Sequence, residues 1–189
     1  MCHIECQEEA LHHILIGLFG FIFIALADIA ACKKIPLVKP LAWVIGIFLL
    51  VYAAASIISN ADRLQWGVWL AIPGVALLFL SLLGLIYTLF INLPFREVYV
   101  EGTSQKLVKT GLYAVVRHPG LYPFFGVMLG LVMVFPSSET IIAAGVWTLA
   151  DLLLIIFEDK VIFPRIFPGY EIYKEETPML IPHLDSLKK

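Results

Sequence analysis

The sequence predicts an all-α membrane protein, a single domain built as a bundle of about five transmembrane helices. Hydrophobic residues make up 60% of the 189 residues and charged residues only 15%, with a mean hydropathy of +0.91. Soluble domains average roughly 45–50% apolar and about 25% charged residues. The apolar residues gather in long runs, and backbone groups in lipid must be hydrogen-bonded internally, so each run is expected to be a helix. The net charge of −2 argues against a nucleic-acid partner.

The apolar runs approach or exceed the length of about 20 residues that a helix needs to cross the hydrocarbon core. They are Leu11–Ala31, Leu41–Ser59, Trp66–Phe90, Tyr113–Phe135 and Thr140–Phe157. The fourth run is irregular: its clean apolar part begins near Leu121, and Pro119 and Pro123 kink or break a helix. We therefore expect it to be short or broken. Within it, Gly126 and Gly130 share a helix face, which permits close helix contact, although glycine is also simply common in membrane helices.

The placement of lysine and arginine predicts the orientation of the bundle. With five spans, the first loop, the third loop and the C-terminal tail fall on one side. Of the 13 basic residues only Arg63 falls on the other side, which leaves 12 on the first. Basic loops face the cytoplasm, so the N-terminus is expected outside and the C-terminus inside.

Two polar blocks interrupt the apolar pattern, over about 105–122 and 158–182. The first is longer than a helix linkage requires, and long ordered loops are usually functional. Arg117 alone has a structural alternative, in which its side chain snorkels to the membrane surface. His118 is harder to explain structurally, because Pro119 fixes the backbone beside it and aims the imidazole. We expect the two blocks to meet on one side of the membrane and form an active site.

The second block opens with two acids, Glu158 and Asp159, at the end of the fifth helix. Acids at a helix C-terminus oppose the helix dipole, so basic neighbours or a bound cation are expected to compensate them, unless this is simply a solvated helix end. Asp151 lies one heptad earlier, so its carboxylate projects from nearly the same helix face as that of Glu158. An ionisable group inside a membrane helix indicates either a pocket or a buried structural partner.

The remaining polar residues predict less chemistry. Asp28 lies near a helix end beside Lys33 and Lys34, which favours a local ion pair. Cys2 and Cys6 stand near histidines, but no complete metal-ligand spacing follows them, so no metal site is predicted.

Residues 105–189 resemble the isoprenylcysteine carboxyl methyltransferase family, to which phospholipid N-methyltransferases are related. The resemblance rests on an acid pair and three motifs, Leu107-Val108-x-x-Gly111-x-Tyr113-x-x-x-Arg117-His118-Pro119, Tyr170-x-x-Tyr173 and Pro178-x-x-x-Pro182. It implies an integral membrane enzyme that uses S-adenosylmethionine. Residues 1–100 would then be a helical scaffold and residues 101–189 the cofactor-binding catalytic region.

The resemblance also implies roles for particular residues. The cofactor would be lined by Gln105, Lys106, Leu107, Val108, Gly111, Tyr113, His118, Pro119, Tyr122 and Glu158. The catalytic candidates are Arg117, His118 and Glu158, together with Asp151, which is a candidate because it is an acid inside a membrane helix and not because of the resemblance. One extra residue follows Pro119 in this chain, so either Leu121 or Tyr122 takes the place of the family's tyrosine. The acceptor would be a lipophilic molecule, isoprenylcysteine-like, a lipid amine or a thiol, that enters sideways from the bilayer.

Two positions depart from the family in a way that bears on the acceptor. Carboxyl methyltransferases of the family carry an arginine one turn before the first acid, where this chain has Leu154. Asp151 adds an acid one turn further in. A pocket that loses a cation and gains an anion should bind a carboxylate poorly, so we expect a neutral or cationic acceptor, such as a lipid amine or a thiol.

Two alternatives stay open from the sequence. One is an NADPH-dependent membrane reductase, because sterol reductases share a similar C-terminal motif, although they are generally much longer. The other is a non-catalytic membrane protein that keeps the fold as a binding or assembly module. The enzyme is expected in the cell or inner membrane of a bacterium, or in the endoplasmic reticulum of a eukaryote, with its site facing the cytoplasm.

Overall fold

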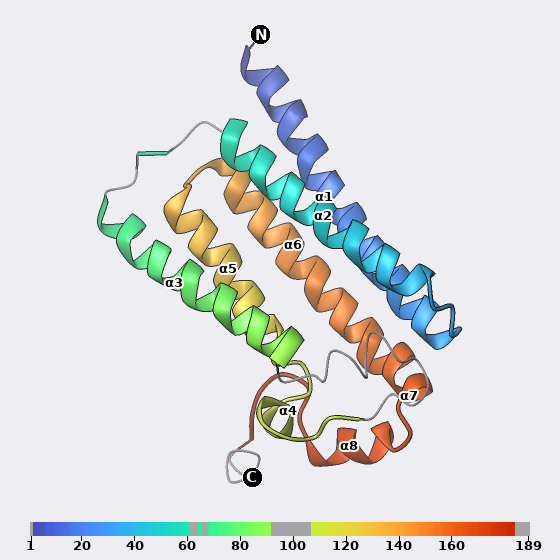
Figure 1. The fold of residues 1–189 in the computed structure, drawn as a ribbon. Coiled ribbons are helices and arrows are strands. Elements are labelled where there is room, and N and C mark those ends of the chain that lie inside the picture. Colours follow the sequence, from blue (N-terminus) through green and yellow to red (C-terminus); the bar gives the residue numbers. More distant parts are fainter. Residues whose placement is uncertain (1, 61–63, 66–67, 92–106, 184–189) are drawn as a thin grey trace.

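The structure is a computed structural model that describes residues 2–60, 64–65, 68–91 and 107–183. In this part of the chain every regular element is a helix, which confirms the all-α prediction. The long helices run alternately up and down along the bundle (Figure 1). They are α1 (Cys2–Cys32), α2 (Val38–Asn60), α3 (Val68–Ile86), α5 (Leu121–Val134) and α6 (Ser138–Phe157).

Four helical segments are long and apolar enough to cross a membrane. They are Glu8–Cys32, Val38–Asn60, Trp69–Leu89 and Ser138–Ile166. α5 has only 14 residues. At 1.5 Å per residue it is about 21 Å long, against about 30 Å for a hydrocarbon core. The described residues therefore contain four full-length candidate spans and one short apolar helix, where the sequence predicted about five spans.

The run over 113–135 is broken in the structure, as the two prolines predicted. Its first residues belong to a separate turn, α4 (Leu112–Val115), and Val116 is extended with φ −142° and ψ 151°. α5 starts after Pro119, and Pro123 lies in its first turn, where the missing N–H costs no helix bond. The interruption leaves an irregular segment between α4 and α5, and this segment carries the arginine–histidine pair.

Glycines bring the helices together in pairs. A Cβ on Gly20 of α1 would lie 2.8 Å from the carbonyl oxygen of Gly46 in α2, and the reverse distance is 2.7 Å. In the same way a Cβ on Gly130 of α5 would lie 2.9 Å from the backbone nitrogen of Leu78 in α3, and Gly126 packs against the same helix. The helix contact expected from the α5 glycines is therefore confirmed.

α6 packs against both pairs, contacting α1 and α5, and its buried tryptophan faces α1. Trp147 is 2% exposed and lies against Gly17 of α1. Its indole N–H donates to the Ile14 carbonyl at 3.1 Å. α6 begins at an N-cap serine, Ser137, whose hydroxyl oxygen accepts from the Thr140 N–H at 3.0 Å.

The polar segments gather at one end of the bundle, opposite the N-terminus (Figure 1). At this end α3 continues into a π-helical turn, η1 (Tyr87–Ile91), and α6 into a second one, η3 (Glu158–Ile162). Two short helices follow η3, namely α7 (Phe163–Ile166) and α8 (Tyr170–Glu176). A π-turn inserts one extra residue per turn and is frequent at functional sites.

Candidate active site

The two polar blocks predicted from the sequence do lie together. The Arg117 N–H donates to the Pro178 carbonyl at 2.9 Å, and the next N–H in the chain donates to the next tail carbonyl at 3.2 Å. The Tyr173 hydroxyl joins α8 to the loop by donating to the Tyr113 carbonyl at 2.5 Å. The loop before α5 and the C-terminal tail are therefore held as one unit.

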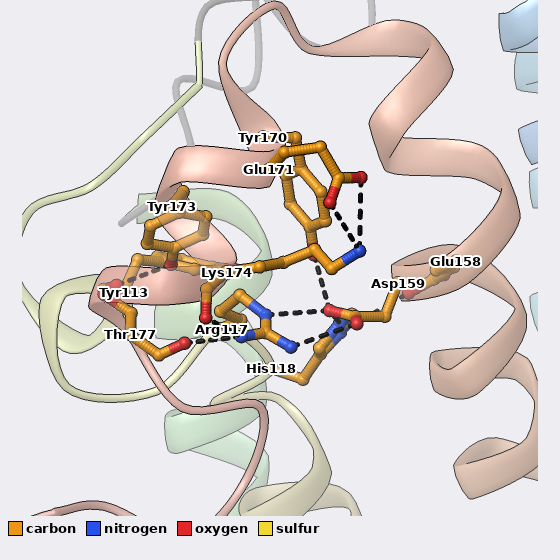
Figure 2. A network of polar contacts seen from close by, with 10 residues as sticks. All are labelled: Tyr113, Arg117, His118, Glu158, Asp159, Tyr170, Glu171, Tyr173, Lys174 and Thr177. Atoms are coloured by element: carbon orange, nitrogen blue, oxygen red, sulfur yellow. Dashed lines mark hydrogen bonds and ion pairs between the residues drawn. The ribbon is translucent and has the colours of Figure 1, made fainter.

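A buried ion pair between Arg117 and Asp159 forms the centre of this unit (Figure 2). The guanidinium Nε donates to Oδ1 at 2.8 Å and Nη2 donates to Oδ2 at 3.0 Å. Nη1 donates to the backbone carbonyls of Lys174 and Thr177. The Arg117 side chain is only 8% exposed, so it does not snorkel to the surface. Bidentate arginine–carboxylate pairs are strong and geometrically specific, which fixes α8 against the end of α6.

Burial and charge shift the pKa values around this pair. Burial lowers the pKa of the Arg117 guanidinium, but the hydrogen bonds and attraction from Asp159 outweigh it, and the pKa is raised. The Tyr170 hydroxyl donates to Asp159 Oδ1 at 2.7 Å. Burial raises the pKa of Tyr170, and this hydrogen bond to a carboxylate raises it further. Burial likewise raises the pKa of Tyr173. Both tyrosines are therefore neutral hydrogen-bond donors at ordinary pH.

The imidazole of His118 lies between the two acids. Its Nε2 is 3.3 Å from Asp159 Oδ1, and its Nδ1 is 3.6 Å from Glu158 Oε2. A carboxylate only accepts hydrogen bonds, so Nε2 carries a proton in this arrangement. The ring of Phe163 stacks on the imidazole with 5.5 Å between centroids and 10° between planes. The ring of His118 is thus fixed, with Nδ1 directed toward Glu158.

Glu158 is surrounded by other acids. Its side chain shares a hydrogen bond with Asp28 of α1, and Asp151 acts on it electrostatically. Oδ2 of Asp28 is buried without a hydrogen-bond partner among the described residues. The basic group that acts on Asp28 is Lys39 of α2, whereas the sequence predicted an ion pair with the lysines that follow α1.

The structure brings most of the predicted site residues to this end of the bundle. Leu107 and Val108 are half-buried, Pro119 is buried, and Gly111 has φ 61° and ψ −132°, a conformation that suits glycine. Tyr122 is 50% exposed, and its hydroxyl donates to a tail carbonyl. Gln105 and Lys106 lie outside the described residues.

Sequence reasoning missed contributions from the first half of the chain. Thr88 in η1 is 2% exposed, and its carbonyl accepts from the Tyr113 hydroxyl at 3.3 Å. Asp28 was placed in a local ion pair, yet it contacts Glu158. An acid within an apolar run was the available signal for Asp28. No comparable signal marked Thr88.

Arg117 is largely satisfied within the protein, because four of its five guanidinium donors have acceptors, two on Asp159 and two on the carbonyls of Lys174 and Thr177. The groups with remaining capacity are the Nδ1 of His118 and the carboxyls of Glu158, Asp28 and Asp151. They could accept hydrogen bonds from a cationic ligand group. No protein-family model, curated protein or solved structure matches the chain.

Proposed function

We propose that the protein is an S-adenosylmethionine-dependent integral membrane methyltransferase that acts on a lipophilic acceptor. The observation that supports this most is the meeting of three segments, the Arg117-His118 loop, the acids at the end of α6 and the C-terminal tail, in one buried polar network. These are the segments in which the sequence resembles the isoprenylcysteine carboxyl methyltransferase family.

The donor and acceptor set suits the proposed cofactor. S-adenosylmethionine carries a sulfonium, an ammonium and a carboxylate. Glu158 would pair with the ammonium, and the buried Oδ2 of Asp28, which lacks a hydrogen-bond partner among the described residues, is a second acceptor for a cationic group. His118 and the backbone of Leu107 and Val108 would hold the remaining polar groups. When bound, the cofactor would supply an electrophilic methyl group.

The chain's own contribution would be positioning and exclusion of water. In an in-line displacement, a bond forms between the acceptor heteroatom and the methyl carbon while the carbon–sulfur bond breaks. Such a reaction depends on holding the two partners in line rather than on an acid or base at the carbon. The side chains of His118 and Asp159 are 6% and 5% exposed, so the polar network lies away from bulk water.

The acceptor is proposed to be neutral or cationic. Leu154 occupies the position where family carboxyl methyltransferases carry an arginine, and it packs against the apolar core. Asp151 lies further into the same helix and acts electrostatically on Glu158. An ammonium acceptor would transfer a proton to an ionised carboxylate of this acidic group before its neutral nitrogen attacks the methyl carbon. Replacing Asp151 with Asn should reduce turnover of a lipid amine and leave binding of the cofactor product nearly unchanged.

The end that carries the polar network is proposed to face the cytoplasm. Lys33, Lys34, Lys160 and Arg165 all lie at this end, and basic residues flank spans on the cytoplasmic side.

Calorimetry on purified protein in detergent tests the proposal. S-adenosylhomocysteine should bind, and His118→Ala or Glu158→Ala should weaken binding by roughly tenfold or more, because each removes a hydrogen bond or charge partner of the ligand. Glu171→Ala is the matched control, since it removes an exposed acid of α8 whose side chain pairs with the Lys174 ammonium at the edge of the network. Binding of NADPH without S-adenosylhomocysteine would refute the proposal and favour a reductase.

A further inference from the structure

Four exposed basic side chains lie on two chain segments that contact each other at the end of the bundle that carries the candidate site. Lys33 and Lys34 belong to the turn after α1, whereas Lys160 and Arg165 lie in η3 and α7. These segments are distant in the chain but adjacent in space. The Cys32 thiol contacts a backbone carbonyl of η3 at 3.9 Å, and Arg165 is close enough to act on that thiol electrostatically. Figure 1 shows the α1–α2 turn and α7 at the same end of the bundle. We call these four residues the basic patch.

The turn that carries the two lysines has a backbone conformation that favours glycine. The Ile35 N–H donates to the Ala30 carbonyl at 3.0 Å and the Lys34 N–H donates to the Ala31 carbonyl at 3.2 Å, the paired bonds of a Schellman motif. Lys34 has φ 53°, in the left-handed region that is unfavourable for a residue with a Cβ. A non-glycine residue in a strained backbone conformation often has a functional side chain. Here it places a second positive charge beside Lys33.

Among the residues that the structure describes, no ion pair neutralises the positive charge of the basic patch. None of its four side chains forms an ion pair within the described part of the chain. Asp28, the nearest acid along α1, interacts with Lys39 and Glu158. The C-terminus of α1 offers only the partial negative charge of a helix end. The patch therefore presents net positive charge outward.

Exposed apolar side chains directly follow the two lysines. Ile35, Leu37 and Val38 are 42%, 81% and 45% exposed. Basic groups beside exposed apolar groups, at the end of helices long enough to span a membrane, match the boundary between lipid headgroups and hydrocarbon. A free phosphate ion would interact with the basic groups, but it has no apolar part that could cover Leu37.

We infer that the basic patch binds the phosphate of an anionic membrane lipid, with the lipid's hydrocarbon chains against Leu37 and its neighbours. The basic groups would attract the headgroup, and the apolar side chains would bury area against its chains. This site is separate from the proposed methyl-transfer chemistry and does not require it.

Native mass spectrometry of the full-length protein, released from nanodiscs, tests the inference. Nanodiscs containing phosphatidylglycerol and phosphatidylcholine in equal amounts should yield protein that retains phosphatidylglycerol. The double variant Lys34→Gln/Arg165→Gln should weaken this retention by about tenfold to thirtyfold, from the contribution of each basic group near an anionic surface.

A matched control removes the same charge elsewhere. Lys109→Gln/Lys174→Gln also eliminates two basic groups at this end of the bundle, but their partners are Glu176 and Glu171. Retention in the control should stay within about twofold of the original protein. Equal losses in both double variants, or equal retention of the two lipids, would overturn the inference. Displacement of the lipid by millimolar inorganic phosphate would also overturn it, because it would indicate a simple anion site.

A single variant separates lipid binding from stability. Lys34→Gly removes one charge and also relieves the left-handed strain, so the thermal midpoint should rise while phosphatidylglycerol retention falls by about fivefold. Retention that rises together with the thermal midpoint would contradict a headgroup role for Lys34.

Discussion

The ion pair between Arg117 and Asp159 should be a structural anchor whose two members cannot be removed separately. The two side chains are 8% and 5% exposed, and they are joined by bonds of 2.8 and 3.0 Å. Removing one member of a buried pair leaves the other charge uncompensated and typically costs about 3–5 kcal/mol. Arg117→Met and Asp159→Leu should each lower the free energy of unfolding by about this amount.

The double variant Arg117→Met/Asp159→Leu should cost much less than the sum of the single variants. Replacing a buried ion pair with apolar side chains of similar volume is often nearly neutral. Here the Tyr170 hydroxyl and the carbonyls of Lys174 and Thr177 also lose a partner, so a residual cost of about 1–3 kcal/mol is expected. The coupling free energy of the pair is the sum of the destabilisation caused by the two single variants minus the destabilisation caused by the double variant.

Equilibrium unfolding in mixed detergent micelles provides the assay. The exposed pair Lys174–Glu171, with side chains 29% and 68% exposed, is the matched control and should show a coupling of only about 0–1 kcal/mol. An Arg117→Met cost below about 1 kcal/mol, or additive single costs, would refute the reasoning. A double variant that recovers stability and S-adenosylhomocysteine binding but no methyl transfer would instead support the catalytic role predicted for Arg117.

Two further predictions concern packing and pH. Gly130→Ala should destabilise the protein by about 1–3 kcal/mol, because the new Cβ would meet the α3 backbone at 2.9 Å. Gly145→Ala should be neutral or stabilising by up to about 1 kcal/mol, because a Cβ there would meet nothing within 4 Å. Thermal unfolding measures both variants, and equal effects would contradict the close packing of α5 against α3. The raised pKa keeps Tyr170 protonated in the folded protein, whereas the unfolded chain ionises above about pH 10, so rising pH favours unfolding. Tyr170→Phe removes this ionisation and should flatten the fall in the free energy of unfolding above about pH 10. An unchanged pH profile of stability would contradict the burial of this hydroxyl.

The helices could be predicted from the sequence because the signal for them is local. A run of apolar residues long enough to cross a bilayer has no regular alternative to a helix. The expected start of the second span, Leu41, and the observed start of α2, Val38, differ by less than one turn. The break in the run over 113–135 was also predicted, because the run contains two prolines and polar residues as well as apolar ones. There the chain forms an irregular segment in place of the first turns of the expected helix.

The site could be predicted only in outline. The sequence indicated that the loop before α5 and the acids after α6 belong together. It did not indicate that Asp159 would form the ion pair with Arg117, or that Glu158 would lie beside His118. Neighbouring residues on a helix point in different directions, and η3 changes those directions by inserting an extra residue per turn. Which of the two acids pairs with Arg117 therefore depends on the local geometry of the π-helical turn.

By itself the sequence determined the class of fold, the approximate extent of the apolar helices, and the two segments that carry polar chemistry. Each of these follows from composition and spacing along a short stretch of chain. Only the tertiary structure decided that Asp28 and Thr88 reach the site from the first half of the chain and that Lys34 and Arg165 share one patch. These features depend on how glycine-packed helices set the spacing and rotation of neighbouring segments. Contacts of that kind join residues far apart in the chain, and no local pattern records them.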